Sequence, residues 1–163
     1  MQPFYTEQQE LLRNTVAGFA ANEVAPRAVE VDSEEKFPRR QMEGLGELGL
    51  LGLSIAEEAG GGGGGYKDLM VVLEEIAAVC GSTSTVLATH ISLSAQTIAK
   101  SANEGQLRRW IPDMAAGKRI GAFALTEPGT GSDALMLSTT AVQDGDDYVL
   151  NGTKHFITNA EAA

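Results

Sequence analysis

Residues 120–133, IGAFALTEPGTGSD, guide the interpretation of this chain, because an apolar run suited to a strand leads directly into a turn rich in polar groups. The turn offers Thr126, two glycines and Ser132 within a few residues. Glycine lets a backbone approach a ligand closely, and successive N–H groups in such a turn form an anion-binding nest. The hydroxyl of Ser132 can donate to the same anion, and that of Thr126 can donate or accept at the other end. The stretch predicts a site for a ligand with a phosphate and an amide-like ring edge.

Residues 129–134 also fit the dinucleotide-binding pattern G-x-G-x-x-A, and they follow an expected strand. That pattern binds a pyrophosphate only where a helix begins and points its N-terminus at the phosphates. Residues 135–142 are instead rich in Ser and Thr and lead into an expected β-hairpin. A nicotinamide-binding Rossmann unit is therefore disfavoured. A plain strand-ending loop over 126–133 remains the alternative to a binding site.

The composition is that of a globular, acidic protein. Its 163 residues are 43% hydrophobic, and 12 basic against 22 acidic residues give a net charge of −10. An acidic surface disfavours binding to nucleic acid or anionic lipid. Cys80 is the single cysteine, so no disulfide framework or thiolate metal site is available, and we expect a buried thiol on a helix. The N-terminus has no apolar signal region and no run of about 18 apolar residues occurs. We expect an intracellular, soluble protein.

Residues 1–118 have the pattern of an all-helical bundle. A capping box of Thr6 and Gln9 predicts a first helix that ends near Asn22, followed over 24–36 by an exposed connection that includes up to another turn or two of helix. Pro38 suits the first residue of a second helix. This helix is expected to bury one apolar face and to end at a glycine; the positions concerned are Met42, Leu45, Leu48, Gly49 and Gly52.

The run of six glycines at 60–65 lacks the Gly-Lys-Ser/Thr of a P-loop and is expected to be a mobile surface loop. Apolar residues at helical spacing then predict three more helices. The first begins at Tyr66 and carries an apolar stripe as far as Cys80. The second spans 84–100. The third begins at a capping box formed by Asn103 and Gln106, and it ends at 116–118.

Residues 119–163 are predicted to be strand and turn. Strands are expected over 120–126, 137–143 and 147–150, with a turn at 144–146. Asn151-Gly152 is the strongest short hairpin signal in the chain, with 153–158 as its second arm. The expected fold class is α+β: an all-α helical bundle followed by the first strands of an antiparallel β-barrel-like domain. Because this region is too short to cover both faces of a sheet, we expect the chain to be a fragment.

No other constellation in the chain suggests catalysis. His90 and His155 lie far apart without metal-ligand spacing, so both are expected to be structural. Glu74 and Glu75 are expected on a solvated helix face. Glu127 lies beside the candidate site without an evident partner. The sequence offers no Ser/His/Asp or Cys/His arrangement.

Two motifs, in this order, resemble the signature of the acyl-CoA dehydrogenases. The first is LTEPGTGSD at 125–133, and the second is YVLNGTKHFITN at 148–159. The resemblance extends to LGELGLLGL at 45–53, LEEIA at 73–77 and RRWIP at 108–112, and so covers essentially the whole chain. Paired motifs in the right order are far more specific than a single glycine pattern.

The resemblance implies an N-terminal helical domain over 1–118 and the beginning of a middle β-domain over 119–163, with the family's C-terminal helical domain absent. It further implies FAD as the cofactor and an acyl-CoA as the substrate. The residues implied to contact FAD are Phe123, Leu125 and Thr126 along the flavin, Gly131 and Ser132 at the pyrophosphate, Phe156 and Ile157 on the ring, and Thr158 near its reactive nitrogen. Ser132 is also implied to lie near the acyl-CoA.

The implied reaction is α,β-dehydrogenation of an acyl-CoA, in fatty-acid or branched-chain amino-acid catabolism. A base removes the α-proton, the β-hydride passes to the flavin, and an electron-transfer flavoprotein reoxidises it. The family's catalytic glutamate lies in the C-terminal domain, so no base is assigned here and the segment alone is expected to be inactive. Family members are commonly homotetramers, so the resemblance implies a homotetramer for the complete protein. It also implies a cytoplasmic protein in bacteria or a mitochondrial matrix protein in eukaryotes.

The chain departs from the family pattern at a few loop positions, none of which removes a flavin-facing group. These positions are Ala56, Ala59, Thr130, Leu135 and Ala160. Two other functions share the same motifs: a flavin oxidase or monooxygenase of the same fold, and a non-catalytic remnant that acts only as an interaction domain.

Overall fold

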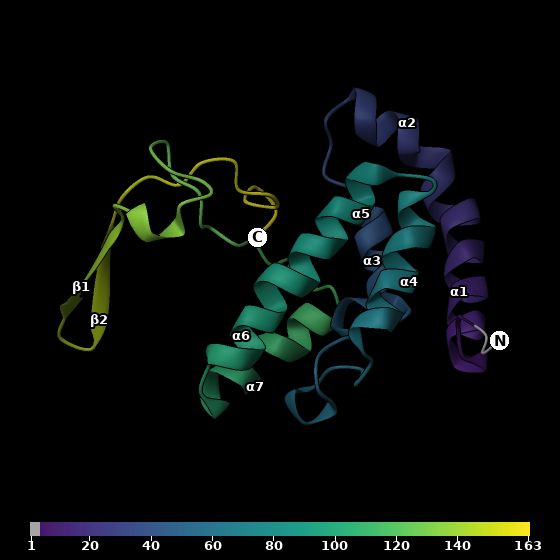
Figure 1. Cartoon of the computed structure of the whole chain (residues 1–163), viewed down its shortest axis with the longest axis horizontal. Coiled ribbons are helices and arrows are strands. Elements are labelled where there is room, and N and C mark those ends of the chain that lie inside the picture. The colour runs from purple at the N-terminus through teal and green to yellow at the C-terminus, as the bar shows by residue number, and fades with distance from the viewer. Residues whose placement is uncertain (1–3) are drawn as a thin grey trace.

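The computed structural model describes residues 4–163, and it shows a helical bundle joined to an extended segment with one β-hairpin (Figure 1). Residues 1–3, part of the N-terminal sequence on which the expectation of no signal peptide rests, lie outside the described residues. The α-helices are α1 Glu7–Phe19, α2 Ala25–Ser33, α3 Arg39–Glu47, α4 Tyr66–Ala77, α5 Gly81–Ala88, α6 Gln96–Ser101 and α7 Glu104–Ala115. The strands are β1 Thr140–Asp144 and β2 Asp147–Asn151. The expected α+β class is confirmed.

The first helix begins as predicted but extends much further. The side chain of Thr6 accepts from Gln9 N and the side chain of Gln9 accepts from Thr6 N, which confirms the capping box. The expected end near Asn22 is wrong, because a π-helical turn over Ala20–Val24 joins α1 directly to α2. Pro26 lies in the first turn of α2, where its missing N–H is tolerated. The further helix expected within 24–36 is therefore present as α2, and it takes up most of the expected connection.

The core lies where α1, α3, α4 and α5 pack together, and helical periodicity predicted most of it. Side chains that are fully buried in this core include Val16, Leu45, Leu51, Ile76, Leu87 and Ile91. Leu48 is an exception, since it is 44% exposed at the end of α3. Gly49 ends that helix with a φ of 72°, as the sequence predicts.

The second long helix contains His90 and Val86, which both bond to the segments of the candidate site. It runs from α5 through a π-helical segment, Thr89–Ala95, into α6, and so covers the predicted span 84–100. Cys80 is buried, as expected, but it caps this helix instead of ending the preceding one. Its Sγ accepts from the backbone N of Thr83 at 3.4 Å.

The glycine run 60–65 is tightly bonded, contrary to the expectation of a mobile loop. Four consecutive glycine N–H groups, at 61–64, donate to backbone carbonyls of residues 52–56 at 2.7–3.1 Å. A Cβ at Gly61 would lie 2.2 Å from the carbonyl oxygen of Ile55. Glycine is needed here because the two backbones touch, and neighbouring glycines share the same packing. The prediction of a mobile loop from the glycine content is therefore wrong.

We predict that Gly61→Ala lowers the free energy of unfolding by about 1–3 kcal/mol, because a methyl group would overlap a backbone that cannot move aside cheaply. Gly18→Ala is the matched control, since Gly18 is exposed within α1 and its added Cβ meets nothing within 4 Å. That control should stabilise the chain by about 0.5–1 kcal/mol. Urea unfolding measures both changes. Equal effects of the two substitutions would contradict the tight packing of the loop.

The β-region contains one hairpin, and its turn differs from the strongest signal in the sequence. β1 and β2 are antiparallel, with Asp144 opposite Asp147 and Thr140 opposite Asn151. The turn is Gly145-Asp146, and only Gly145 has a positive φ, 63°, which is the type II′ pattern. The predicted strand over 147–150 is confirmed, and the one over 137–143 begins only at Thr140.

The hairpin predicted at Asn151-Gly152 is wrong. A type I′ turn needs positive φ at both residues, and neither has it. Asn151 instead ends β2. A Cβ on Gly152 would lie 2.2 Å from Oγ1 of Thr139, so glycine is needed here because the backbone passes close to Thr139. The strand expected over 120–126 is likewise absent: residues 120–126 belong to no strand of the described sheet.

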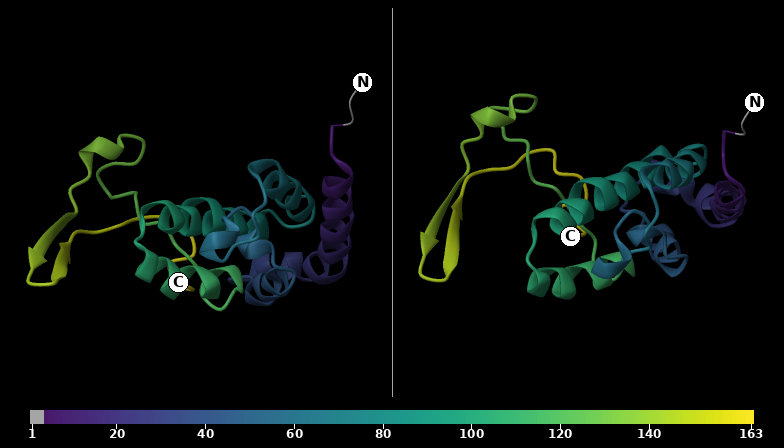
Figure 2. Two further views of the ribbon diagram at one scale, coloured as in Figure 1. Left: turned by 90° about the horizontal axis from the view of Figure 1, so that it is seen from below. Right: turned by 60° about the horizontal axis from the view of Figure 1, so that its bottom comes forward.

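The hairpin projects away from the helices, and every residue of both strands is exposed (Figure 2). The C-terminal segment returns from the hairpin to the helical bundle, where it ends beside the segment that leaves α7 (Figure 2). Within the described part of the chain, no helix has the length and apolarity needed to cross a bilayer.

Candidate functional site

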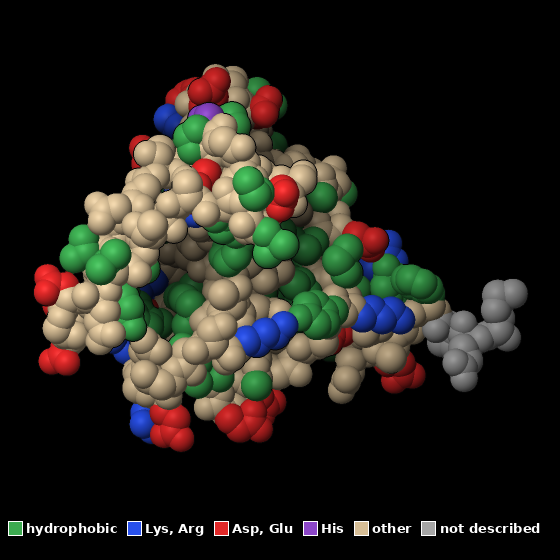
Figure 3. Space-filling view, turned by 60° about the vertical axis from the view of Figure 1, so that its left-hand side comes forward, with side chains coloured by type: hydrophobic (Ala, Val, Ile, Leu, Met, Phe, Trp, Pro, Cys, Tyr) green, Lys and Arg blue, Asp and Glu red, His purple; other side chains and the backbone are tan. Residues whose placement is uncertain are grey.

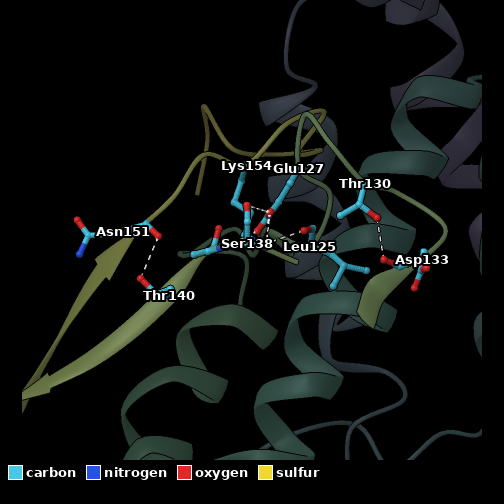
Figure 4. A network of polar contacts seen from close by, with 9 residues as sticks. Leu125, Glu127, Thr130, Asp133, Ser138, Thr140, Asn151 and Lys154 are labelled. Atoms are coloured by element: carbon cyan, nitrogen blue, oxygen red, sulfur yellow. Dashed lines mark hydrogen bonds and ion pairs between the residues drawn. The ribbon is translucent and has the colours of Figure 1, made fainter. Parts of the chain in front are cut away.

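The two sequence motifs lie side by side where the chain leaves and re-enters the hairpin (Figure 4). The backbone N of His155 donates to the carbonyl oxygen of Thr126 at 2.8 Å. Nζ of Lys154 donates to the carbonyl oxygen of Leu125 at 2.9 Å. The first and second motifs, separated by the whole hairpin in sequence, therefore form one structure.

Glu127 is the centre of the polar network that joins the motifs (Figure 4). The residue as a whole is only 4% exposed. The carboxylate accepts from Ser138 N at 2.7 Å, Ser138 Oγ at 2.6 Å, Thr139 N at 2.9 Å and Lys154 Nζ at 2.9 Å. The expectation that Glu127 has no partner is wrong. Its partners lie 11 to 27 residues away in sequence, so local spacing could not reveal them.

These donors fix the charge on Glu127. Hydrogen bonds from Ser138, then from Thr139 and from Lys154, hold the pKa of the Glu127 carboxyl well below its ordinary value of 4.5. Hydrogen bonds to the ionised form of an acid favour that form. Glu127 is therefore ionised, and its hydrogen bonds hold the two motifs together. Its role is structural and not that of a proton-transfer group.

The loop of the first motif is held by its own polar groups. Glu127 and Thr130 exchange backbone hydrogen bonds at 2.9 and 3.1 Å, and Oγ1 of Thr130 donates to the carbonyl oxygen of Asp133 at 2.7 Å. A Cβ on Gly131 would lie 4.0 Å from Cγ2 of Thr126, so Gly131 faces Thr126 across the turn. Gly131 and Ser132 are both exposed. The part of the turn that is predicted to meet a phosphate is therefore accessible to a ligand.

The second motif presents an aromatic ring to solvent. Phe156 is 82% exposed, and its φ of 55° lies in the left-handed region, which a bulky residue adopts only at a cost. Its ring stacks on that of His155 with centroids 3.8 Å apart. The following residues, Ile157 and Thr158, are half-buried. Strain and exposure together are typical of a residue that has a function outside its own fold.

Ile157 and Thr158 line a pocket of about 430 Å³ between the second motif and the helical bundle. Phe37 and Val86 contribute apolar walls from the loop before α3 and from α5. Figure 3 shows that the side of the molecule that carries the hairpin is hollowed, with hydrophobic side chains inside the hollow and charged side chains around it. Phe123 and Leu125, the remaining predicted residues, are half-buried.

His90 and Asn159 anchor both motifs to the helical bundle. His90 is fully buried; its Nε2 lies 3.1 Å from the carbonyl oxygen of Met114, and its Nδ1 accepts from Gly121 N at 2.9 Å. Nδ2 of Asn159 donates to the carbonyl oxygens of Gly121 at 3.0 Å and Val86 at 3.1 Å. His90 is structural, as expected. Asn159 was not singled out, although its place in the second motif was the available signal.

Burial lowers the pKa of His90 below its ordinary value of 6.5, which predicts a pH-dependent stability. The unfolded chain binds a proton at about pH 6.5 and the folded chain does not, so stability falls as the pH decreases through this value. The slope contributed by one such group reaches about 1.4 kcal/mol per pH unit. Urea unfolding at several pH values from about 7.5 to about 5.5 measures this slope, and His90→Asn should remove it. An unchanged slope in that variant would contradict the assignment.

Among the described residues, no group of three or more His, Cys, Asp or Glu side chains could hold a metal ion. The candidate site therefore consists of amides, hydroxyls and apolar side chains around a turn, together with the ionised pair of Glu127 and Lys154.

Comparisons with known proteins agree with this geometry. The family model for the acyl-CoA dehydrogenase N-terminal domain matches residues 6–118, and that for the middle domain matches residues 122–163. A short-chain specific acyl-CoA dehydrogenase of Clostridium acetobutylicum is 42% identical over 158 residues, which are 97% of this chain and 42% of that protein.

Two solved structures superpose on the whole chain. One, reported for an electron transferring flavoprotein of Acidaminococcus fermentans, has a TM-score of 0.94 and 37% identity, and 43% of it is covered. The other, an acyl-CoA dehydrogenase of Bacillus anthracis complexed with FAD, has a TM-score of 0.92 and 34% identity, and 28% of it is covered. The chain spans less than half the length of these relatives. Both domain matches and the full-length superpositions show that the chain belongs to the acyl-CoA dehydrogenase family.

Proposed function

We propose that the protein carrying this chain catalyses FAD-dependent α,β-dehydrogenation of an acyl-CoA thioester. The observation that carries the proposal is the junction of the two motifs, in which Lys154 donates to both Glu127 and the carbonyl oxygen of Leu125. This junction joins two segments that both carry exposed groups: Gly131 and Ser132 in the first motif, and the ring of Phe156 in the second. The family membership supports the same reaction class.

The residues of the site fit FAD chemically. A flavin ring needs an apolar surface, and the exposed, strained Phe156 offers one that its own fold does not cover. A pyrophosphate needs N–H and O–H donors, and Gly131 and Ser132 are exposed in a turn that supplies both. We assign FAD contacts to Phe123, Leu125, Thr126, Gly131, Ser132, Phe156, Ile157 and Thr158. FAD, when bound, supplies the acceptor for the hydride that leaves the β-carbon.

The chain's own contribution is positioning. Ser132 binds the acyl-CoA as well as the cofactor phosphate, and the hydroxyls of Thr126 and Thr158 orient the edge of the flavin ring. Phe156 and Ile157 cover ring surface and keep water from it. Each neutral hydrogen bond adds only about 0.5–1.5 kcal/mol, so tight binding requires the whole set.

We propose further that this segment needs the remainder of a longer protein for turnover. The matched relatives are more than twice as long as the part that the chain covers. Glu127 is unsuited to be the base that removes the α-proton, because its carboxylate already accepts four hydrogen bonds and these hold its pKa well below the ordinary value, which makes it a weak base. We therefore place the base outside this chain. An electron-transfer flavoprotein as the oxidant of the reduced cofactor, and a tetrameric assembly, complete the proposal.

Anaerobic addition of an acyl-CoA to the purified, flavin-loaded protein tests the reaction. Short-chain thioesters come first, since the Clostridium acetobutylicum relative is named for them. The proposal predicts bleaching of the flavin absorbance and an α,β-unsaturated thioester as product. Rapid peroxide formation in air would instead indicate an oxidase, and a native protein that binds no flavin would indicate a non-catalytic interaction domain. Turnover by residues 1–163 alone would contradict the need for the remainder.

A further inference from the structure

Gly121 is the point at which both motifs are attached to the helical bundle. Its N–H donates to Nδ1 of His90 at 2.9 Å, and its carbonyl oxygen accepts from Nδ2 of Asn159 at 3.0 Å. Both side chains are buried, with exposures of 0% and 8%. Gly121 lies just before the first motif, separated from Leu125 by residues 122–124, and Asn159 ends the second motif directly after Thr158. The two motifs therefore share one fixed reference point.

Each of the two side chains also bonds a helix of the bundle. Nε2 of His90 donates to the carbonyl oxygen of Met114, near the end of α7, which leaves Nδ1 as the acceptor and fixes the neutral ring. The second N–H of Asn159 donates to the carbonyl oxygen of Val86 in α5. Because both acceptors of Asn159 are carbonyls, they determine which end of its amide carries the hydrogens.

The backbone at this junction is constrained as well. A Cβ on Gly121 would lie 2.2 Å from Oγ of Ser94 and 2.7 Å from Cε of Met114, so the chain passes too close to the bundle for any side chain. Asn159 has a φ of 70°, which glycine and asparagine tolerate best. Neither feature helps to form a helix or a strand.

We infer that His90 and Asn159 are positioning residues, which set the two motifs in register through Gly121 and thereby place Thr158 and the 122–126 segment for the flavin. The inference rests on the proposed function for its ligand, but the anchor itself is a property of the protein without FAD. His90 and Asn159 do not touch the cofactor in this account; they act through the backbone of Gly121 and of the residue that precedes Asn159.

Two substitutions at His90 separate this role from simple core packing. In His90→Asn, Oδ1 takes the place of Nδ1 and keeps an acceptor for Gly121 N–H. In His90→Gln, Nε2 takes the place of the ring Nε2 and keeps a donor for Met114, but Gly121 N–H loses its acceptor. In His90→Asn the carbonyl oxygen of Met114 loses the donor of the ring. It keeps a second donor, because it also accepts from Gly117 N at 3.1 Å. A buried donor without a partner is the more costly loss.

Hydrogen exchange of the protein without FAD, followed by mass spectrometry, reads the anchor directly. We expect exchange over residues 120–126 and 156–163 to be about threefold to tenfold faster in His90→Gln than in His90→Asn, with little difference in α1. FAD titration of the same proteins should give about tenfold weaker binding for the glutamine variant than for the asparagine variant. Equal exchange in the two variants would overturn the inference.

Asn159→Gly provides the second test if both His90 variants fail to fold. Glycine keeps the positive φ but removes both amide donors, so we expect the same faster exchange over 120–126. Unchanged exchange there would overturn the inference. A wild-type protein that binds no FAD, yet shows the expected exchange differences, would leave the anchor in place and refute the proposed function. FAD binding that is equal in all variants would refute the positioning role alone.

Discussion

Lys154→Met is expected to reduce turnover of acyl-CoA by about 10- to 100-fold, the scale of loss that a displaced catalytic geometry produces. The substitution keeps the aliphatic stem and removes the ammonium group, which bonds Glu127 and the carbonyl oxygen of Leu125. The carboxylate of Glu127, a residue only 4% exposed, then has no cation beside it among the described residues. Breaking a buried ion pair by removing one partner is strongly destabilising. We therefore also expect the thermal midpoint to fall by several degrees.

The ion pair of Arg108 with Glu104 is a matched control. It lies on the surface of α7, with side-chain exposures of 77% and 85%, and joins residues four apart in the helix. Arg108→Met should leave the thermal midpoint and turnover close to wild type, since exposed pairs contribute little. Glu127→Gln combined with Lys154→Met should be less harmful than Lys154→Met alone, because the unpaired charge is gone. Equal losses in the two ion-pair variants would contradict the role of the Glu127–Lys154 junction.

Phe156→Gly is expected to stabilise the apoprotein while it weakens FAD binding. A non-glycine residue in the left-handed region costs about 1–2 kcal/mol, and the φ of Phe156 is 55°. Glycine removes that cost but loses more conformational freedom on folding, so the net gain should be about 0.5–1 kcal/mol. Because the ring is 82% exposed, little packing is lost. Loss of an aromatic surface from the flavin should weaken FAD binding by about tenfold.

Phe156→Trp is the control for this prediction, since it keeps both the aromatic surface and the strained backbone. It should bind FAD nearly as well as the wild type, without the gain in stability. Urea unfolding of the apoprotein and fluorescence titration with FAD measure the two effects separately. A Phe156→Gly variant with lower stability and unchanged FAD affinity would show that the exposed ring belongs to the fold and not to a ligand site.

The helical part of the fold could be predicted because its determinants are local. The capping boxes at Thr6 and Asn103 and the apolar stripes mark their helices directly. The ends of helices were harder to predict, because the π-helical turn over Ala20–Val24 continues the first helix past its expected end near Asn22. The glycines at 60–65 were misread for a similar reason: only the approach of residues 52–56 explains them, and that is a tertiary contact.

In the β-region and the site, too, local signals could be predicted and tertiary contacts could not. Asn151-Gly152 has the strongest local turn signal, yet the packing of Gly152 on Thr139 overrides it. The site residues themselves, such as Thr126 and Ser132, were selected by chemistry and family resemblance, and their contacts with FAD stay a prediction. The residues that hold these site residues in place were not predicted. Glu127, Lys154 and Asn159 act through bonds that span 11 to 73 residues, a separation at which sequence spacing carries no information.

We propose that residues 120–133 and 154–159 form one FAD site. Hydrogen exchange of the protein that carries this chain, compared with and without FAD, tests it most directly. We expect slower exchange with FAD over residues 123–132 and 156–158, and no change at the hairpin tip around Gly145 or in the glycine run 60–65. FAD binding that leaves both motifs unprotected, or that protects only one of them, would contradict a shared site.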